Sequence, residues 1–198
     1  IIPLEPDLIL STRFSASTAV NLLQNFGYPV TNLGFPTTLE QTFQQIQEVA
    51  QILGEQERGT RLIQVLQNRI RIVQESLEPQ RDLTAVFYSN NGFSFGSGTL
   101  RDEFLNSLGM KNLASEKGLI GSGKLPIELL ISEQPDLLLI DQSGLHDEKL
   151  AQPLLQHPVL EQYFPAEKVI VLPSTLFQCA GPSLVEAYEL MAQALGKL

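Results

Sequence analysis

This sequence of 198 residues has no tryptophan, one cysteine and few basic side chains, and it lacks long apolar runs. The single cysteine, Cys179, excludes an internal disulfide but leaves the redox compartment open. The 13 Lys and Arg stand against 22 Asp and Glu, and the resulting formal charge of −9 disfavours nucleic acid as a partner. Purely aliphatic stretches such as Leu137–Ile140 have the length of a strand, far below the ~18 residues of a membrane-spanning helix.

Enough apolar material is present for a large core, with 43% hydrophobic and 18% charged residues. Two similar phrases, Glu5–Leu10 and Gln134–Ile140, place Pro and Asp directly before a continuous apolar run. Such a run is typical of a parallel strand buried on both faces. The phrases therefore predict two sheets, or two halves of the molecule.

Helical spacing follows the first of these strands. Apolar residues recur from Ala19 to Phe26, which predicts a helix that ends at Gly27. A strand expected over 28–33 then completes a βαβ unit. From 55 to 78 the helical pattern is almost unbroken, and it predicts a rigid strut about 36 Å long.

A capping box formed by Thr37 and Glu40 is expected to begin the helix that precedes this strut. In the second half, strands and helices alternate again. The strands are expected over 84–88, 137–140 and 169–172. This order predicts an α/β fold of two Rossmann-like lobes with parallel sheets, joined by a single long helix.

Three segments make up the predicted domain organisation. A partial N-terminal α/β lobe covers 1–54, the interlobe helix covers 55–78, and a C-terminal α/β lobe covers 79–198. Because the sequence opens on Ile1 and enters a strand almost at once, we expect the N-terminal lobe to be truncated.

Polar loops follow the predicted strands at their carboxyl ends, where open parallel sheets bind ligands. They are Ser11–Phe14, Ser89–Gly98, Asp141–Ser143 and Ser174–Cys179. Strand-to-helix loops also need such residues for capping and turning, so each loop taken singly is a weak signal. Together they predict a ligand cleft, to which Asn91 and Gln142 contribute from their loops.

Aromatic side chains recur in these loops. Phe93 and Phe95 flank glycines, Phe14 follows Arg13, and Phe177 lies in the last loop. Such residues either face a ligand or fold back into the core. Arg13 among them would suit an anionic or carboxylate-bearing ligand.

The phrase Gly92-Phe-Ser94-Phe-Gly96 matches the nucleophile elbow of serine hydrolases. An elbow needs its helix directly behind the Ser, whereas two further glycines intervene before Thr99, the expected helix cap. Both histidines also precede the last strand, where a hydrolase triad would need one to follow it. The phrase therefore fits a ligand-facing loop better, with serine hydrolysis as the alternative.

The phrase Gly118–Lys124 satisfies G-x-x-x-x-G-K, but Leu125 stands where a phosphate-binding loop needs a hydroxyl, so no nucleotide is expected. His146 lies beside acids in a polar loop, a setting more typical of a solvated side chain than of a metal ligand. No metal site, cofactor or catalytic residue is predicted.

The order of these motifs resembles the substrate-binding proteins of ABC importers for iron-siderophores, haem and cobalamin. Leu4–Leu10 and Phe26–Val30 are similar to phrases of that family's N-terminal lobe. Leu108–Asn112, Leu125–Leu130 and Gln134–Leu137 are similar to its C-terminal signature. Each match is loose alone, and their order and spacing make the resemblance fairly specific.

The resemblance implies two lobes on a helical strut, with Arg13, Phe93 and Phe177 in loops that face the ligand. It also implies that Glu128 docks to Arg residues of the permease, although a first-turn acid is equally explained by the helix dipole. The matching N-terminal position is Thr18, which is not acidic.

The function implied is capture without chemistry. The cargo that such a cleft implies is a bulky metal chelate, with a ferric siderophore expected first and cobalamin as an alternative on the same scaffold. The protein is expected to work as a monomer with an ABC permease, in the periplasm or lipid-anchored at the outer face of the cytoplasmic membrane.

Overall fold

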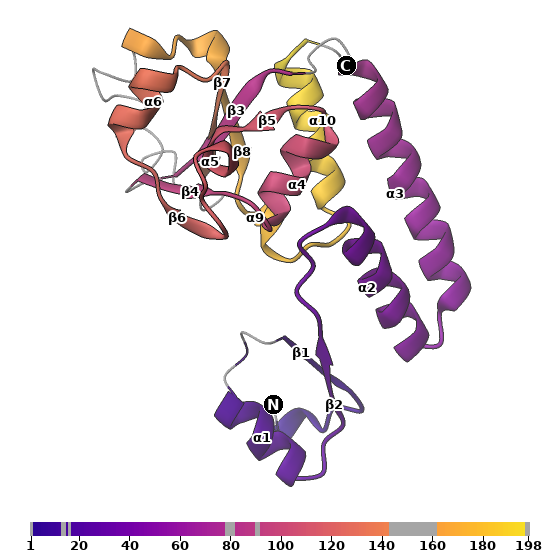
Figure 1. Ribbon diagram of the computed structural model, residues 1–198. Coiled ribbons are helices and arrows are strands. Elements are labelled where there is room, and N and C mark those ends of the chain that lie inside the picture. The colour runs from indigo at the N-terminus through magenta and orange to yellow at the C-terminus, as the bar shows by residue number, and fades with distance from the viewer. Residues whose placement is uncertain are drawn as a thin grey trace. The chain divides into compact units, whose positions relative to one another are not determined.

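The structure is a computed structural model, which describes residues 2–12, 15, 17–77, 82–89, 92–142 and 162–196 (Figure 1). The chain divides into two compact units, Ile1–Pro36 and Thr37–Leu198. Among the described residues, no helix has both the length and the apolar character needed to cross a membrane.

The first unit is a small βαβ arrangement. A turn of 3-10 helix, η1 (Ile2–Leu4), precedes β1 (Ile9–Thr12), α1 (Ser17–Asn25) and β2 (Val30–Leu33). The two strands pair in parallel, from Ile9 opposite Val30 to Thr12 opposite Leu33. Gly27 follows α1 at φ +84°, a conformation that favours glycine, and thereby ends the helix. The βαβ unit expected from the sequence is confirmed.

A four-stranded parallel sheet forms the centre of the second unit. Its strands are β3 (Thr84–Tyr88), β5 (Lys111–Asn112), β7 (Leu137–Gln142) and β8 (Val169–Pro173), in the order β5-β3-β7-β8. All pairs are parallel. The predicted α/β class with parallel sheets is therefore confirmed.

Helices cover both faces of this sheet (Figure 1). They are α2 (Leu39–Ile52), α3 (Gln56–Ser76), α4 (Leu100–Ser107), α5 (Leu113–Glu116), α6 (Ile127–Glu133), η4 (Ala166–Lys168), α9 (Thr175–Gln178) and α10 (Leu184–Ala194). Successive residues of β3 point to opposite faces of the sheet. Ala85 and Phe87 therefore pack with α3, α4 and α10, whereas Val86 and Tyr88 pack with α5 and α6. Continuous apolar runs are what such doubly covered strands require.

The long helix α3 packs along α10. Its buried residues Leu66, Ile70 and Val73 belong to the stripe expected from the sequence. At the edge of this contact the Arg69 guanidinium donates two hydrogen bonds to the Glu189 carboxylate, at 2.8 and 2.7 Å, and this raises the pKa of Arg69. The strut is thus a long helix, as expected, and it is anchored on the C-terminal sheet layer.

Close packing of α2 on α3 places α2 in the second unit. A Cβ on Gly59 would lie 2.5 Å from the Ala50 Cβ, so glycine is what allows the two helices to approach. The sequence placed residues up to 54 with the N-terminal lobe, whereas the compact units divide after Pro36. The cap of α2 also differs by one residue, since Thr38, not Thr37, accepts the hydrogen bond from the Gln41 amide.

Candidate ligand-binding site

The carboxyl ends of β3, β7 and β8 lie at one edge of the second unit's sheet, because these strands are parallel neighbours. Ligands bind beyond this edge in open α/β sheets. Of all the predicted ligand residues, Arg13, Phe14 and Asn91 lie outside the described residues, as does the loop after Gln142. Gln142 itself is the last residue of β7.

The segment after β3 forms a short strand where a loop was expected. β4 (Phe93–Phe95) pairs antiparallel with β6 (Ser122–Lys124), with Phe93 opposite Lys124 and Phe95 opposite Ser122. The sequence signal for a loop came from the glycines, but Gly96 among them has a packing role. The prediction of an open glycine loop was therefore wrong for 93–95.

Gly96 allows β4 to lie against the segment before β6, and Gly123 lets the Leu119 side chain pack on β6. A Cβ on Gly96 would lie 2.0 Å from the carbonyl oxygen of Leu119, and one on Gly123 would lie 2.9 Å from a Leu119 methyl. The Gly96 amide donates to the Gly121 carbonyl at 2.8 Å. Gly96 thus serves backbone contact within the protein, and not the approach of a chelate that the sequence suggested.

Ser94 is buried in the middle of β4. Its side chain is 0% exposed, and its hydroxyl donates to the Phe87 carbonyl at 2.7 Å. A nucleophile elbow would instead hold an exposed Ser at a strand-to-helix turn. The helix α4 begins later in the chain, and the Thr99 side chain caps it by accepting a hydrogen bond from the Asp102 amide. The hydrolase interpretation has no support in this geometry.

Three of the four predicted aromatic contacts are described, and they differ in exposure. Phe93 is 42% exposed on β4, and Phe95 is half-buried against the core. Phe177 lies in α9, is 4% exposed and packs edge-on against Phe87 and Phe104, with both ring centroids 5.3 Å away. Phe177 therefore folds back into the core, the alternative left open by the sequence, and Phe93 is the ring that stays accessible.

Arg101 joins this aromatic group and was missed by sequence reasoning. Its guanidinium carbon lies 3.9 Å from the centroid of the Phe95 ring, 4.9 Å from that of Phe177 and 5.8 Å from that of Phe87. These are cation–π distances. The partners are distant in sequence, so no local pattern around Arg101 could have predicted the cluster.

A buried network of polar side chains connects β4 to α4. The Asp102 carboxylate accepts hydrogen bonds from the Asn112 amide at 2.8 Å and the Ser115 hydroxyl at 2.5 Å. The Asn112 amide also donates to the Phe95 carbonyl at 2.8 Å. Satisfied networks of this kind hold one arrangement of a core. The position of β4 is therefore set before any ligand binds.

Glu128, the predicted docking acid, lies exposed in the first turn of α6. The Tyr88 hydroxyl donates to the Leu125 carbonyl at 3.2 Å just before this helix. Burial raises the pKa of Tyr88, and the negative charge of Glu128 raises it further. Thr18 lies exposed on α1, in the other unit.

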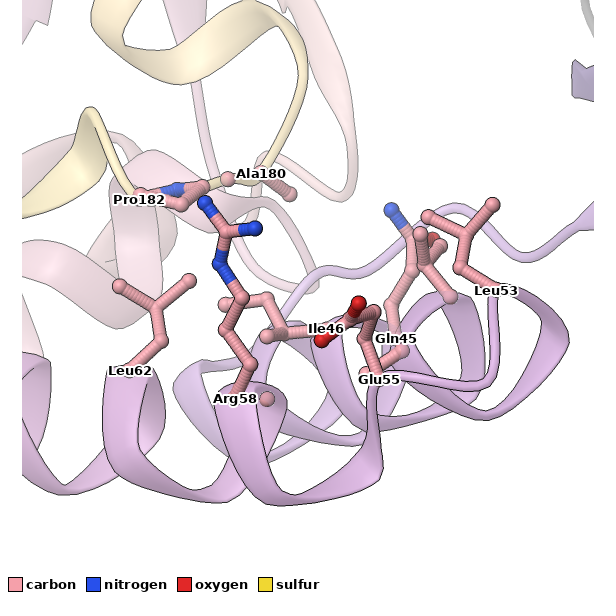
Figure 2. A pocket seen from close by; sticks show the side chains of 12 residues that line it. Gln45, Ile46, Leu53, Glu55, Arg58, Leu62, Ala180 and Pro182 are labelled. Carbon is pink, nitrogen blue, oxygen red and sulfur yellow. The ribbon is translucent and has the colours of Figure 1, made fainter.

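A pocket of about 360 Å³ lies elsewhere in the second unit, between α2, the first half of α3 and the loop before α10 (Figure 2). Its wall is mainly apolar, and the Arg58 side chain extends across it toward Ala180 and Pro182 (Figure 2). None of the predicted ligand residues lines it. Within the described ranges, no group of three or more His, Cys, Asp or Glu side chains could hold a metal ion.

The parallel sheet covered by helices defines an α/β protein, and the comparisons identify its family. The profile of the periplasmic binding protein family matches residues 1–175, so the chain belongs to this family. The resemblance recognised in the sequence is thereby confirmed. No curated protein matches the sequence.

Solved structures share the fold. The periplasmic haem-binding protein of Roseiflexus sp. RS-1 is 24% identical, with a TM-score of 0.80 over 98% of this chain and 78% of that one. An Fe³⁺-hydroxamate transport protein of Saccharomonospora viridis is 18% identical, with a TM-score of 0.79 over 98% and 70%. The vitamin B12-binding protein of Vibrio cholerae is 14% identical, with a TM-score of 0.75 over 98% and 76%. At these identities the likeness establishes the common fold.

Proposed function

We propose that this protein captures a metal chelate, a ferric siderophore in the first place, and delivers it to an ABC permease. The chelate would bind at the strand-end loops of the second unit, and Arg13 and Phe14 stay predicted ligand contacts. The protein would work as a monomer in the periplasm or at the outer face of the cytoplasmic membrane. Membership of the periplasmic binding protein family supports capture and transport.

The observation that carries the proposal is the exposed Phe93 on β4, a strand that is held in place by hydrogen bonds. Single exposed apolar side chains are common on protein surfaces, so Phe93 supports binding through its position beyond the carboxyl end of β3, where ligands bind in open parallel sheets. Here Phe93 is 42% exposed while the strand beneath it is held by the buried Ser94 and by Asn112. A rigid, accessible ring is suited to contact a bulky chelate with little ordering cost.

Haem and cobalamin are the second candidates, because structures that share the fold include a haem-binding protein and a vitamin B12-binding protein. Haem iron is usually held by an axial side chain such as His or Tyr. Both histidines, His146 and His157, lie outside the described residues. A ligand-binding experiment therefore has to distinguish a siderophore, haem and cobalamin.

Thermal denaturation with added ligands tests capture. We expect one of a ferric trihydroxamate, a ferric tricatecholate, haemin or cyanocobalamin to raise the melting temperature saturably, because a ligand that binds only the folded state stabilises it by about 2.7 kcal/mol at a hundredfold excess over Kd. A generic ester serves as the activity control. Ester turnover that disappears in Ser94→Ala would instead establish a hydrolase.

Delivery through Glu128 has its own test. A carboxylate that pairs with Arg across an interface contributes to the affinity of the two proteins mainly when the ion pair is desolvated. We expect Glu128→Gln to lower ligand-stimulated transport by the reconstituted permease about tenfold while leaving chelate affinity unchanged. Glu116→Gln is the matched control, since Glu116 is an exposed acid on the neighbouring helix α5. Equal transport by both variants would remove Glu128 from the docking scheme.

A further inference from the structure

The pocket between α2, the first half of α3 and the loop before α10 shares no residue with the predicted chelate contacts. Its wall consists of aliphatic side chains and glycines, and its polar members are Gln45, Glu55 and Arg58. The volume of about 360 Å³ falls in the range of small-molecule sites. At the roughly 30 Å³ that one water molecule takes up in the liquid, this is room for about a dozen non-hydrogen atoms.

Two large apolar side chains of the pocket wall are accessible. Leu53 is 58% exposed at the C-terminal end of α2, and Leu62 is 37% exposed on α3. Ile46 of α2 lines the same hollow (Figure 2). Single exposed apolar side chains are ordinary on a surface, whereas apolar side chains gathered in a concave site are typical of ligand binding. This wall therefore suits the apolar part of a ligand.

Close packing fixes the walls of the pocket. Glycine at position 59 lets α3 approach Ala50 of α2. In the loop before α10, the Gly181 carbonyl accepts a hydrogen bond from the Leu184 amide at 3.0 Å. Ala180 in this loop is buried and adopts φ +39°, a conformation that residues other than glycine rarely adopt and that persists only where the surroundings hold it. A ligand therefore meets walls that need little ordering.

Arg58 brings a positive charge to the pocket. Its side chain leaves the first turn of α3 and extends across the apolar wall toward Ala180 and Pro182 (Figure 2). The other described arginines have partners, three in ion pairs and one on aromatic rings: Arg61, Arg69, Arg71 and Arg101. Among the described residues, none forms an ion pair or a hydrogen bond with the Arg58 guanidinium. This guanidinium is therefore available to an anionic group of a ligand.

Glu55 is the other charged residue of the lining. It is the N-cap residue of α3 and makes no side-chain capping hydrogen bond. Carboxylates without a basic partner are expected on a chain with 22 acidic and 13 basic residues, whereas an unpaired arginine is the less common case. A guanidinium also binds both oxygens of one carboxylate through parallel hydrogen bonds. The pocket therefore favours an anionic ligand over a cationic one.

We infer that this pocket is a second ligand site, and that it binds a monocarboxylate with an apolar body, of about a dozen non-hydrogen atoms in all, such as a medium-chain fatty acid. Arg58 binds the carboxylate, and Ile46, Leu53 and Leu62 contact the hydrocarbon chain. The inference goes beyond capture of a metal chelate and does not depend on it.

Calorimetric titration with decanoate, decanol and decylamine tests the inference, because these compounds share one hydrocarbon chain and differ in the charge of the head group. We expect decanoate to bind about tenfold more tightly than decanol, the effect of one charge-assisted hydrogen bond that solvent partly screens. Arg58→Gln should lower the decanoate affinity about tenfold and change the decanol affinity less than about twofold. Glu55→Gln should raise the decanoate affinity about twofold, because it removes a like charge.

Arg61→Gln is the matched control. It removes the same charge about one turn further along α3, outside the lining, where Arg61 pairs with Glu57 at 3.4 Å. Every Kd should stay unchanged in this variant. Equal Kd values for decanoate and decanol, or equal losses in Arg58→Gln and Arg61→Gln, would overturn the inference. Tighter binding of decylamine than of decanoate would overturn it too, as would binding of none of the three, while a chelate that raises the melting temperature would leave the proposed function standing.

Discussion

Gly96→Ala is expected to lower the free energy of unfolding by about 3 kcal/mol, near the upper end for overpacking. The added Cβ would lie 2.0 Å from the Leu119 carbonyl oxygen and 2.6 Å from its carbonyl carbon. These are backbone atoms, so no side-chain rotation can relieve the clash. Urea unfolding followed by circular dichroism measures the change.

Gly98→Ala provides the matched control. Gly98 lies two residues further along, at φ +78°, and a Cβ added there would have no heavy atom within 4 Å apart from its chain neighbours. Gly98→Ala should therefore lower the free energy of unfolding by only about 1 kcal/mol, the strain of a left-handed backbone conformation in a residue with a Cβ. If Gly96→Ala and Gly98→Ala destabilise equally, the close approach of β4 to Leu119 does not govern stability.

Phe177→Ala is expected to cost about 4 kcal/mol of unfolding free energy, because it removes a fully packed ring from the core. The ring contacts Phe87 and Phe104 edge-on, and Arg101 stacks against it at 4.9 Å. Edge-to-face pairs add to the stabilisation from the buried area. Calorimetry or urea unfolding gives the value.

Phe93→Ala is the contrasting variant. A side chain that is 42% exposed contributes little to folding, so stability should stay within about 0.5 kcal/mol. Chelate affinity should fall about tenfold, since a ring that covers the ligand is lost. A large loss of stability in Phe93→Ala, or none in Phe177→Ala, would reverse the roles assigned to the two residues.

The parallel sheet was predictable because its strands carry local signals. Apolar runs preceded by Pro and Asp mark β1 and β7, and both are strands in the structure. Helical spacing likewise predicted α3 to within two residues at each end, 55–78 against Gln56–Ser76. These patterns are short-range, so one sequence is enough to read them.

The candidate site was only partly predictable. Sequence reasoning predicted the strand-end loops and Phe93 as ligand contacts, which stays a prediction, and it expected the glycines of 92–98 to let the backbone approach a ligand. Whether a glycine faces a ligand or another backbone depends on what lies across from it. Gly96 faces Leu119, which comes three elements later in the chain, after α4, β5 and α5. The same holds for Phe177, whose burial depends on Phe87 and Phe104.

By itself, the sequence determined the α/β class, the long helix α3, the strands β1, β2, β3, β7 and β8, and the resemblance to binding proteins of ABC importers, because periodicity and motif order are properties of the chain. Only the tertiary structure decided which side chains meet. It buried Ser94 and Phe177, left Phe93 accessible, and brought Arg101 to Phe95 and Lys124 to Phe93. Contacts between residues distant in sequence form only when sheet and helices pack, so no local pattern encodes them.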